Sequence, residues 1–243
     1  MINDCDPLLV NNGEGFTLLS EGVVDVWLFS HVQTEPNDTL LAQWLSDEEI
    51  SRAQQFHSSN HRNQFIVRRA ILRHILGRYT AQSPETLQFQ IGAYGKLALA
   101  VSPFHFNVSH SQEMVAVAVA LSTVGIDIEA IQPLTNMALI AHDHFSPDEQ
   151  ATLFQLPPDE QLSAFYRCWT RKEAIIKADG RGIAISLDLF AVTLGATEPA
   201  RLVTKPDDMA DWHLANLTFS SSFMGAVASL KEIEQVRCGW YIV

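Results

Sequence analysis

The chain has 243 residues, of which 47% are hydrophobic and 18% charged, and this is typical of a globular protein with one large domain or two small ones. Its formal net charge of −12 argues against a general nucleic-acid or anionic-membrane binder. No secretory signal is visible, and the longest apolar run, at 115–121, is too short to span a bilayer. Cys5, Cys168 and Cys238 are widely spaced, which predicts neither a metal site nor a disulfide framework, so we expect a cytoplasmic protein.

The first half of the chain is predicted to combine strands with two helices. Its predicted elements are, in order, a loosely ordered lead-in at 1–21, a strand at 23–30, helices at 46–56 and 60–79, and strands at 87–91, 96–100, 104–108 and 115–121. Ser46 and Glu49 have the spacing of a capping box, which predicts the start of the first helix. Asn60 is expected to cap the second helix.

Basic residues are concentrated in this half, although the chain as a whole is acidic. Seven of the sixteen lysines and arginines lie close together in the sequence: Arg52, Arg62, Arg68, Arg69, Arg73, Arg78 and Lys96. They could form a solvated basic face of a helix. They could instead bind a ligand with several phosphate groups, to which Arg and Lys donate charge-assisted hydrogen bonds.

The segment 109–113 is expected to be the connection between two strands. Neighbours in an extended chain point in opposite directions, so His110 is poorly placed to activate Ser109 as a hydrolytic nucleophile. The end of this hairpin could instead cradle an anion with its backbone N–H groups. Alternatively, the Ser and His side chains only satisfy local backbone groups.

The segment 124–129 alternates apolar and acidic residues, which is typical of a half-buried strand. Ile126 and Ile128 would face a core, and Asp127 and Glu129 would share the opposite face. At roughly 3.3 Å rise per residue, the two carboxylates begin about 6.6 Å apart and can converge on one ion. Their mutual repulsion must be compensated by water, a base or a hard divalent cation.

A helix is predicted between the prolines at 157–158 and the Asp-Gly stop at 179–180. One of its faces carries side chains spaced four residues apart, namely Phe165, Trp169, Glu173 and Lys177. After this helix, strands are predicted at 187–194, 212–219 and 223–230, with a surface loop at 199–211.

The acidic and basic residues of this helix have two interpretations. Glu173 and Lys177 could form an exposed ion pair beside a packed Trp. If Glu173 converges with Asp127 and Glu129 instead, the three carboxylates form a site of the kind that Mg²⁺ uses alongside substrate phosphates. Lys177 would then be placed to meet those phosphates. His142 and His144 are interpreted as surface residues, not as metal ligands.

Two of these segments together resemble the signature of the 4'-phosphopantetheinyl transferases, most closely the surfactin-synthetase-activating type. They are Gly125-Ile-Asp-Ile-Glu129 and, about forty residues later, Trp169-Thr-Arg-Lys-Glu-Ala-Ile-Ile-Lys177. The resemblance runs from about Leu45 to Phe190, and its other motifs are Tyr94-Gly-Lys96, Phe106-Asn-Val-Ser-His110, Phe145-Ser-Pro-Asp-Glu149 and Lys177-Ala-Asp-Gly-Arg-Gly182. Each motif alone is weak, but their order and spacing together are specific.

The resemblance implies an α+β fold of two similar α+β halves related by a pseudo-twofold axis. The halves would span 22–122 and 123–243, and a monomer is expected. The implied activity moves the 4'-phosphopantetheinyl arm of coenzyme A onto a serine of an apo acyl or peptidyl carrier protein. The reaction would depend on Mg²⁺ and release 3',5'-ADP.

The resemblance also implies roles for individual residues. Asp127, Glu129 and Glu173 would be the metal ligands, and Glu173, or a water held by it or by Glu129, would be the base. Lys177 would stabilise the charge of the pyrophosphate. The implied contacts to coenzyme A are Arg52, Lys96, Ser109 and His110, with Arg69 as a further candidate.

One departure from the family pattern affects the Tyr-Gly-Lys motif. Family members usually have Pro after the lysine, whereas Leu97 follows Lys96 here, and this puts the angle of the loop in doubt. Two rival functions remain open at this point. The same three carboxylates could serve a Mg²⁺-dependent phosphohydrolase, or the protein could be a non-catalytic relative that binds carrier proteins.

Overall fold

The computed structural model describes residues 6–7, 18–31 and 41–241, so most of the predicted lead-in at 1–21 lies outside the described residues. In chain order the elements are β1 (Asp6–Pro7), β2 (Val23–Ser30), α2 (Asp47–Gln54), α3 (Ser59–Thr80), η1 (Pro84–Thr86), β3 (Phe89–Ile91), β4 (Leu97–Leu99), β5 (His105–Ser111), β6 (Met114–Ala120), β7 (Val124–Ala130), α4 (Met137–His144), α5 (Pro147–Gln155), α6 (Pro158–Asp179), η2 (Gly182–Ala184), η3 (Leu187–Leu189), β8 (Ala191–Val192), β9 (Leu202–Thr204), β10 (His213–Leu217), β11 (Phe223–Ser229) and β12 (Gln235–Trp240). Within the described ranges, every helix is too short or too polar to span a bilayer.

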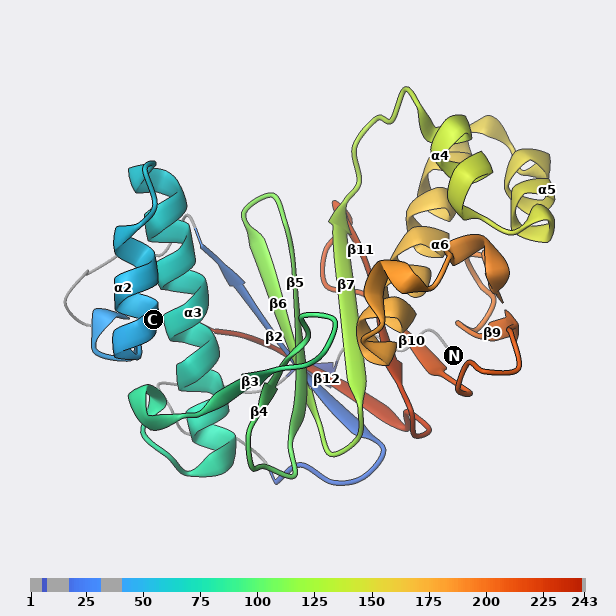
Figure 1. Cartoon of the computed structure of the whole chain (residues 1–243). Coiled ribbons are helices and arrows are strands. Elements are labelled where there is room, and N and C mark those ends of the chain that lie inside the picture. The colour runs from blue at the N-terminus through green and yellow to red at the C-terminus, as the bar shows by residue number, and fades with distance from the viewer. Residues whose placement is uncertain (1–5, 8–17, 32–40, 242–243) are drawn as a thin grey trace.

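Two sheets occupy the centre of the molecule, with α3 on the outer side of one and α6 on the outer side of the other (Figure 1). The first sheet has the order β1-β12-β2-β6-β5, and the second has the order β10-β11-β7. Hydrophobic clusters fill the spaces between these layers. In β2, Trp27 and Phe29 pack in the cluster toward α3, whereas Val26 and Leu28 pack in the cluster between the sheets. This alternation is the two-residue period of a strand with both faces buried.

The two halves of the chain repeat the same succession of elements. The long helices α3 and α6 each have 22 residues, and each follows a short helix, α2 or α5, that begins with a capping box. The antiparallel strands β2, β6 and β5 correspond to β7, β11 and β10. The predicted α+β fold of two similar halves is therefore confirmed. The predicted boundary between residues 122 and 123 falls in the turn from β6 to β7 and stays a prediction.

The strand β12, which the sequence pattern did not predict, crosses back to the first sheet and pairs in parallel with β2. Arg237 of β12 donates hydrogen bonds of 2.6 and 2.8 Å to the carboxylate of Asp25 on β2, which is only 1% exposed. Tyr79 of α3 donates a further bond of 2.6 Å to the same carboxylate. A buried carboxylate is tolerated only with such partners, so this contact fixes β12 against the first half.

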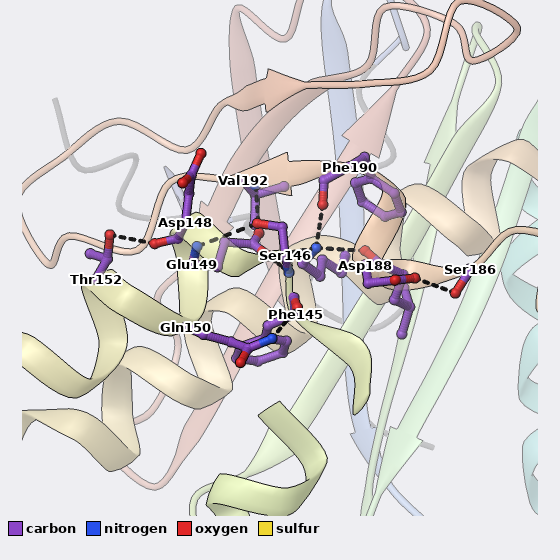
Figure 2. Close-up of polar contacts among 12 residues, drawn as sticks. Phe145, Ser146, Asp148, Glu149, Gln150, Thr152, Ser186, Asp188, Phe190 and Val192 are labelled. Carbon is purple, nitrogen blue, oxygen red and sulfur yellow. Dashed lines mark hydrogen bonds and ion pairs between the residues drawn. The ribbon is translucent and has the colours of Figure 1, made fainter. Parts of the chain in front are cut away.

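A buried ion pair organises the segment that follows α6. The ammonium of Lys172 lies 2.7 Å from the carboxylate of Glu149, and both side chains are buried. Lys172 also donates to the carbonyls of Leu187 at 2.7 Å and Phe190 at 2.5 Å. Figure 2 shows the other side of the pair, where the Glu149 carboxylate accepts the N–H of Val192 at 2.7 Å. The charged pair therefore satisfies backbone groups that a neighbouring strand would otherwise bind.

Three local predictions are corrected by the structure. The predicted strand at 187–194 is wrong for most of its length, because these buried charges hold its backbone in η3 and the short β8. The predicted cap Asn60 is wrong, since Ser58 caps α3 with its side chain. The expectation of no disulfide is wrong for Cys238, which is disulfide-bonded, whereas Cys168 is a buried free thiol.

The strand β7 passes very close to α6 at Gly125. A Cβ at this position would lie 2.1 Å from the carbonyl oxygen of Ala174 and 2.4 Å from the backbone nitrogen of Ala178. Both atoms belong to the backbone of α6, so a side chain at this position would push the helix away from the strand. The acidic residues of β7 and those of α6 are brought together by this close approach.

Gly125→Ala is therefore expected to destabilise the protein by about 1–3 kcal/mol or more, because the added methyl group overpacks a rigid contact. Gly92→Ala is the matched control, since its Cβ would meet only the Lys96 carbonyl oxygen at an ordinary 3.4 Å. Urea denaturation of both variants measures the free energy of unfolding. Equal midpoints for the two variants would contradict this account of the strand–helix contact.

Candidate active site

A cleft of about 800 Å³ lies between α3 and α6 and is bordered by the β3–β4 hairpin and by β5. Its walls include most of the residues singled out in the sequence: Arg52, Arg69, Lys96, His110, Glu173 and Lys177. Ser109, Asp127 and Glu129 are not part of its surface and lie in or beside the strands at its floor. The side facing α3 is rich in arginine, and the side facing α6 carries Glu173 and Lys177.

Asp127 on β7 is buried, with 3% of its surface exposed. Its Oδ1 accepts hydrogen bonds from the Lys177 ammonium at 2.6 Å and from the Ser109 hydroxyl at 2.9 Å. Its Oδ2 is also buried and has no hydrogen-bond partner among the described residues. Two residues further along the strand, Glu129 accepts a hydrogen bond of 2.7 Å from the Ser111 hydroxyl.

The charge of Glu129 influences both of the other predicted carboxylates. Burial raises the pKa of Asp127 to about 7, although Lys177 opposes this shift, and the charge of Glu129 raises it further. Burial also raises the pKa of Glu173, Lys177 opposes this shift, and Glu129 again adds to it. Glu129 thus adds negative charge around both of the other groups, and Lys177 is the protein's own cation beside them.

The residues present fit a hard divalent cation. Among the described residues, no three acidic, His or Cys side chains have their donor atoms already arranged around a metal position. However, Asp127 presents a buried oxygen without a partner, and a buried acceptor of this kind is costly unless something donates to it or binds it. Carboxylate oxygens are the ligands that Mg²⁺ takes in proteins. Glu129 and Glu173 are the neighbouring carboxylates that could complete such a site.

Lys177 bonds to Asp127 and not to Glu173. Its ammonium lies 2.6 Å from the Asp127 carboxylate and 3.0 Å from the Ser109 hydroxyl. The interpretation of Glu173 and Lys177 as an exposed pair on the helix surface is therefore wrong, because the strand β7 offers Lys177 a buried carboxylate. Both Glu173 and Lys177 still face the cleft, as their spacing predicts.

The basic residues of the first half divide into two groups. Arg73 is buried, contacts Glu49 of the α2 capping box and donates to the carbonyls of Pro84 and Leu87, so it holds the fold together. Arg69 also pairs with Glu49, at 3.1 Å. The cleft is lined by Arg52, Arg68 and Arg69. Of the seven basic residues, Arg52, Arg68, Arg69 and Lys96 line the cleft, whereas Arg73 has a structural role that neither interpretation included.

Lys96 joins the β3–β4 hairpin to the second half of the chain. Its ammonium donates to the carbonyl of Ala178 at 2.7 Å and to that of Val124 at 3.2 Å. Burial lowers its pKa to about 8. An ammonium has three hydrogen-bond donors, so two are used inside the protein and one is left for a ligand in the cleft.

The segment containing Ser109 and His110 is strand and not connection. β5 continues to Ser111, and only Gln112 and Glu113 separate it from β6, with Gln112 at a φ of 53°. The predicted connection at 109–113 is therefore wrong for its first three residues. As expected for neighbours in an extended chain, the side chains of Ser109 and His110 point in opposite directions. Ser109 bonds to Asp127 beneath the cleft, and His110 lines the cleft itself.

Several cleft residues were not predicted from the sequence. Arg68 and Tyr94 line the cleft without having been named as contacts to coenzyme A. His144 is exposed, as expected of a surface residue, and it also lines the cleft. His144 lies at the end of α4, with its ring 5.6 Å from that of Trp169, edge to face. Its position follows from the packing of α4 against α6, for which the sequence carries no local signal.

The chain is similar to known proteins over most of its length. A family model described as the 4'-phosphopantetheinyl transferase superfamily matches residues 123–230. The 4'-phosphopantetheinyl transferase HetI of Nostoc sp. is 38% identical over 217 residues, which cover 87% of this chain and 89% of HetI. The 4'-phosphopantetheinyl transferase psf-1 of Bacillus pumilus is 32% identical over 192 residues, covering 79% of this chain and 81% of psf-1.

A solved structure is also similar to part of the chain. The crystal structure of Thermotoga maritima holo-[acyl-carrier-protein] synthase aligns with a TM-score of 0.36 and 21% identity, over 46% of this chain and 64% of that protein. On the strength of the sequence relatives, the chain belongs to the 4'-phosphopantetheinyl transferase superfamily. The predicted family is confirmed, and so is the prediction that the protein is a transferase.

Lys172 and Glu173 are neighbours in the Trp-Thr-Arg-Lys-Glu motif, but we expect their replacement to affect stability differently. Lys172→Met leaves Glu149 buried without its cation and should lower the free energy of unfolding by about 3–5 kcal/mol. Glu173→Gln, one residue away, faces the cleft and should change it by less than about 1 kcal/mol. Urea denaturation measures both. If Glu173→Gln proved less stable than Lys172→Met, the assignment of Lys172 to the fold and Glu173 to the cleft would be wrong.

Proposed function

We propose that the protein transfers the 4'-phosphopantetheinyl arm of coenzyme A to a serine hydroxyl of an apo acyl or peptidyl carrier protein and releases 3',5'-ADP. One observation carries the proposal: a single cleft has arginines on one side and Glu173 and Lys177 on the other, and beneath its surface Lys177 bonds to the buried Asp127 two residues before Glu129. A phosphorylated donor fits the basic side. A phosphoryl-transfer step fits the acidic side, where a cation and a base are needed together.

The basic side would hold the adenylate end of coenzyme A. Arg52 lies on the cleft wall with its guanidinium 5.4 Å from the centre of the Phe65 ring, which keeps the charge at the surface of the cleft. Arg69 lines the same wall, and His110 faces it from β5. Arg and His donors suit phosphate groups, and the third donor of Lys96 would add a further contact. Ser109, which bonds to Asp127, would act on the acidic side instead of touching coenzyme A.

The acidic side would hold Mg²⁺ through Asp127, Glu129 and Glu173. When bound, Mg²⁺ would neutralise the charge of the pyrophosphate oxygens. Lys177 lies against Asp127 and faces the cleft, so its ammonium would stay close to the same pyrophosphate as negative charge builds on the leaving phosphate.

In the reaction, the serine oxygen of the carrier forms a bond to the phosphorus that bears the pantetheine arm. The bond from that phosphorus to the oxygen of the 3',5'-ADP leaving group breaks. The serine proton passes to Glu173 or to a water that Glu173 holds. The raised pKa of Glu173 suits this role, because a base with a pKa nearer neutrality is a better proton acceptor than an ordinary carboxylate. The two halves of one chain complete the cleft, so we propose that a monomer is the active form.

Transfer can be tested by incubating the protein with coenzyme A, Mg²⁺ and an apo carrier protein and then measuring the mass of the carrier. A mass gain of one phosphopantetheine is expected, and Glu173→Gln should slow it by about 10²–10⁴-fold. Phosphate release without carrier would indicate a phosphohydrolase, and carrier binding without a mass gain would indicate a non-catalytic relative. Removal of divalent cations with a chelator should abolish the gain.

The affinity for coenzyme A is expected to fall as the pH rises above about 8. Below the pKa of about 8, Lys96 is charged both in the free protein and beside a bound phosphate, so affinity does not depend on its proton. Above that pKa, binding must first return a proton to Lys96, because the phosphate favours the charged form. Calorimetric titration with coenzyme A at a series of pH values measures the slope.

Lys96→Arg provides the matched control, since a guanidinium stays charged throughout this range. Above about pH 8, the affinity of this variant for coenzyme A should depend less on pH than that of the wild-type protein. Parallel slopes for the two proteins would mean that Lys96 does not contact a phosphate of the bound ligand.

A further inference from the structure

The strands β5 and β7 are the end strands of the two sheets, where β5 pairs with β6 and β7 pairs with β11, and they lie edge to edge without a backbone ladder between them. Side chains of β5 replace that ladder. Asn107 Oδ1 accepts the N–H of Ile126 at 3.0 Å. Two residues later, Ser109 Oγ accepts the N–H of Ile128 at 3.2 Å, and after two more, Ser111 Oγ accepts the N–H of Ala130 at 3.0 Å. We call Asn107, Ser109 and Ser111 the side-chain ladder.

The two serines of the side-chain ladder each make a second hydrogen bond that the asparagine is not seen to make. Ser109 donates its hydroxyl hydrogen to the Asp127 carboxylate at 2.9 Å. Ser111 donates in the same way to the Glu129 carboxylate at 2.7 Å. A hydroxyl has one donor and two acceptor lone pairs, so each serine can bond at once to the backbone of β7 and to a carboxylate on the same strand.

The repeated serine–carboxylate contact follows from the geometry of the two strands. Both strands have a two-residue period, so the side chains of residues 109 and 111 point the same way, as do those of residues 127 and 129. Each serine therefore meets one carboxylate at the same relative position. A glutamate has three rotatable side-chain bonds and can take many positions, and a hydrogen bond to a fixed hydroxyl restricts it to few.

We propose that Ser111, acting with Ser109, is a positioning residue for the divalent cation: its hydroxyl, supplied by the first half of the chain, aims the Glu129 carboxylate of the second half. The inference rests on the proposed function, in which Asp127, Glu129 and Glu173 hold Mg²⁺. Groups that hold a metal-binding side chain in place change metal affinity by about 10–100-fold when they are removed. Metal affinity thus depends on how the two halves of the chain are docked.

Ser111 is the better probe of the two serines. Ser109 also bonds to Lys177, so its replacement would disturb the lysine together with Asp127. Ser111 contacts the Glu129 carboxylate and the Ala130 N–H. Ser111→Ala removes both of these bonds, whereas Asn107→Ala removes one bond of the same side-chain ladder, to Ile126, without touching a carboxylate.

The test measures Mn²⁺ binding by electron paramagnetic resonance at saturating coenzyme A, with Mg²⁺ added as competitor. Ser111→Ala should bind either ion about 10–100-fold more weakly than the wild-type protein, and Asn107→Ala should stay within about twofold. Ser111→Thr keeps the hydroxyl and suits a strand, so it should restore most of the affinity. At saturating Mg²⁺, the turnover of Ser111→Ala should return to most of the wild-type value. The variant should therefore differ from the wild-type protein mainly in the concentration of Mg²⁺ that it requires.

Other outcomes would overturn the inference or the function on which it rests. Unchanged Mn²⁺ affinity in Ser111→Ala, with normal binding by the wild-type protein, would show that Ser111 does not aim Glu129. An equal loss in Asn107→Ala would show that the side-chain ladder only holds the halves together. Absence of Mn²⁺ binding by the wild-type protein would instead count against the proposed metal site itself. A urea midpoint for each variant identifies any loss that comes from unfolding.

Discussion

The buried carboxylate of Asp127 is the constraint on which the arrangement of the cleft depends. A charge in this position is tolerated only with partners, and the partners come from two other elements: Lys177 from α6 and Ser109 from β5. The three elements must meet within hydrogen-bond distance, and Gly125 allows the helix to approach the strand closely enough. The lysine neutralises only one side of the carboxylate, because the second oxygen has no partner among the described residues. The same contact that holds the halves together therefore leaves one oxygen of this buried carboxylate unsatisfied within the described part of the chain.

Buried ion pairs of the same design stabilise both halves away from the cleft. In each half, the glutamate of a capping box pairs with a basic residue of the long helix, Glu49 with Arg73 and Glu149 with Lys172. In each half, that basic residue also binds carbonyls of the segment that follows the helix. This explains why adjacent residues of one motif have different tasks. Lys172 holds the backbone beside α6, and Glu173 is presented to the cleft.

Local periodicity in the sequence predicted much of the fold and part of the site. The alternation of 124–129 and the four-residue spacing in α6 correctly placed β7, the long helix and the cleft-facing Glu173 and Lys177. What failed depended on partners distant in the sequence. The sequence around Leu187 and Phe190 predicts a strand, but Lys172 forms hydrogen bonds to their carbonyls and prevents strand pairing there. The segment of β12 is too short and polar to be predicted as a strand without its partner β2. The pairing of Lys177 with Asp127 likewise requires knowledge of how α6 crosses β7.

The return of β12 to the first sheet has a consequence for how the protein folds during synthesis. Residues 235–240 are made more than two hundred residues after the start of β2, yet they occupy the edge of β2 and bring Arg237 to the buried Asp25. The first half can form its helices early, but until the second half has been translated its sheet keeps an open edge at β2, and Asp25 has the Tyr79 hydroxyl but not the Arg237 guanidinium as a partner. Pairing over such a separation in sequence is slow, and an open edge invites association with other chains. The nascent first half is thus the stage of synthesis at which this protein most depends on protection from its neighbours.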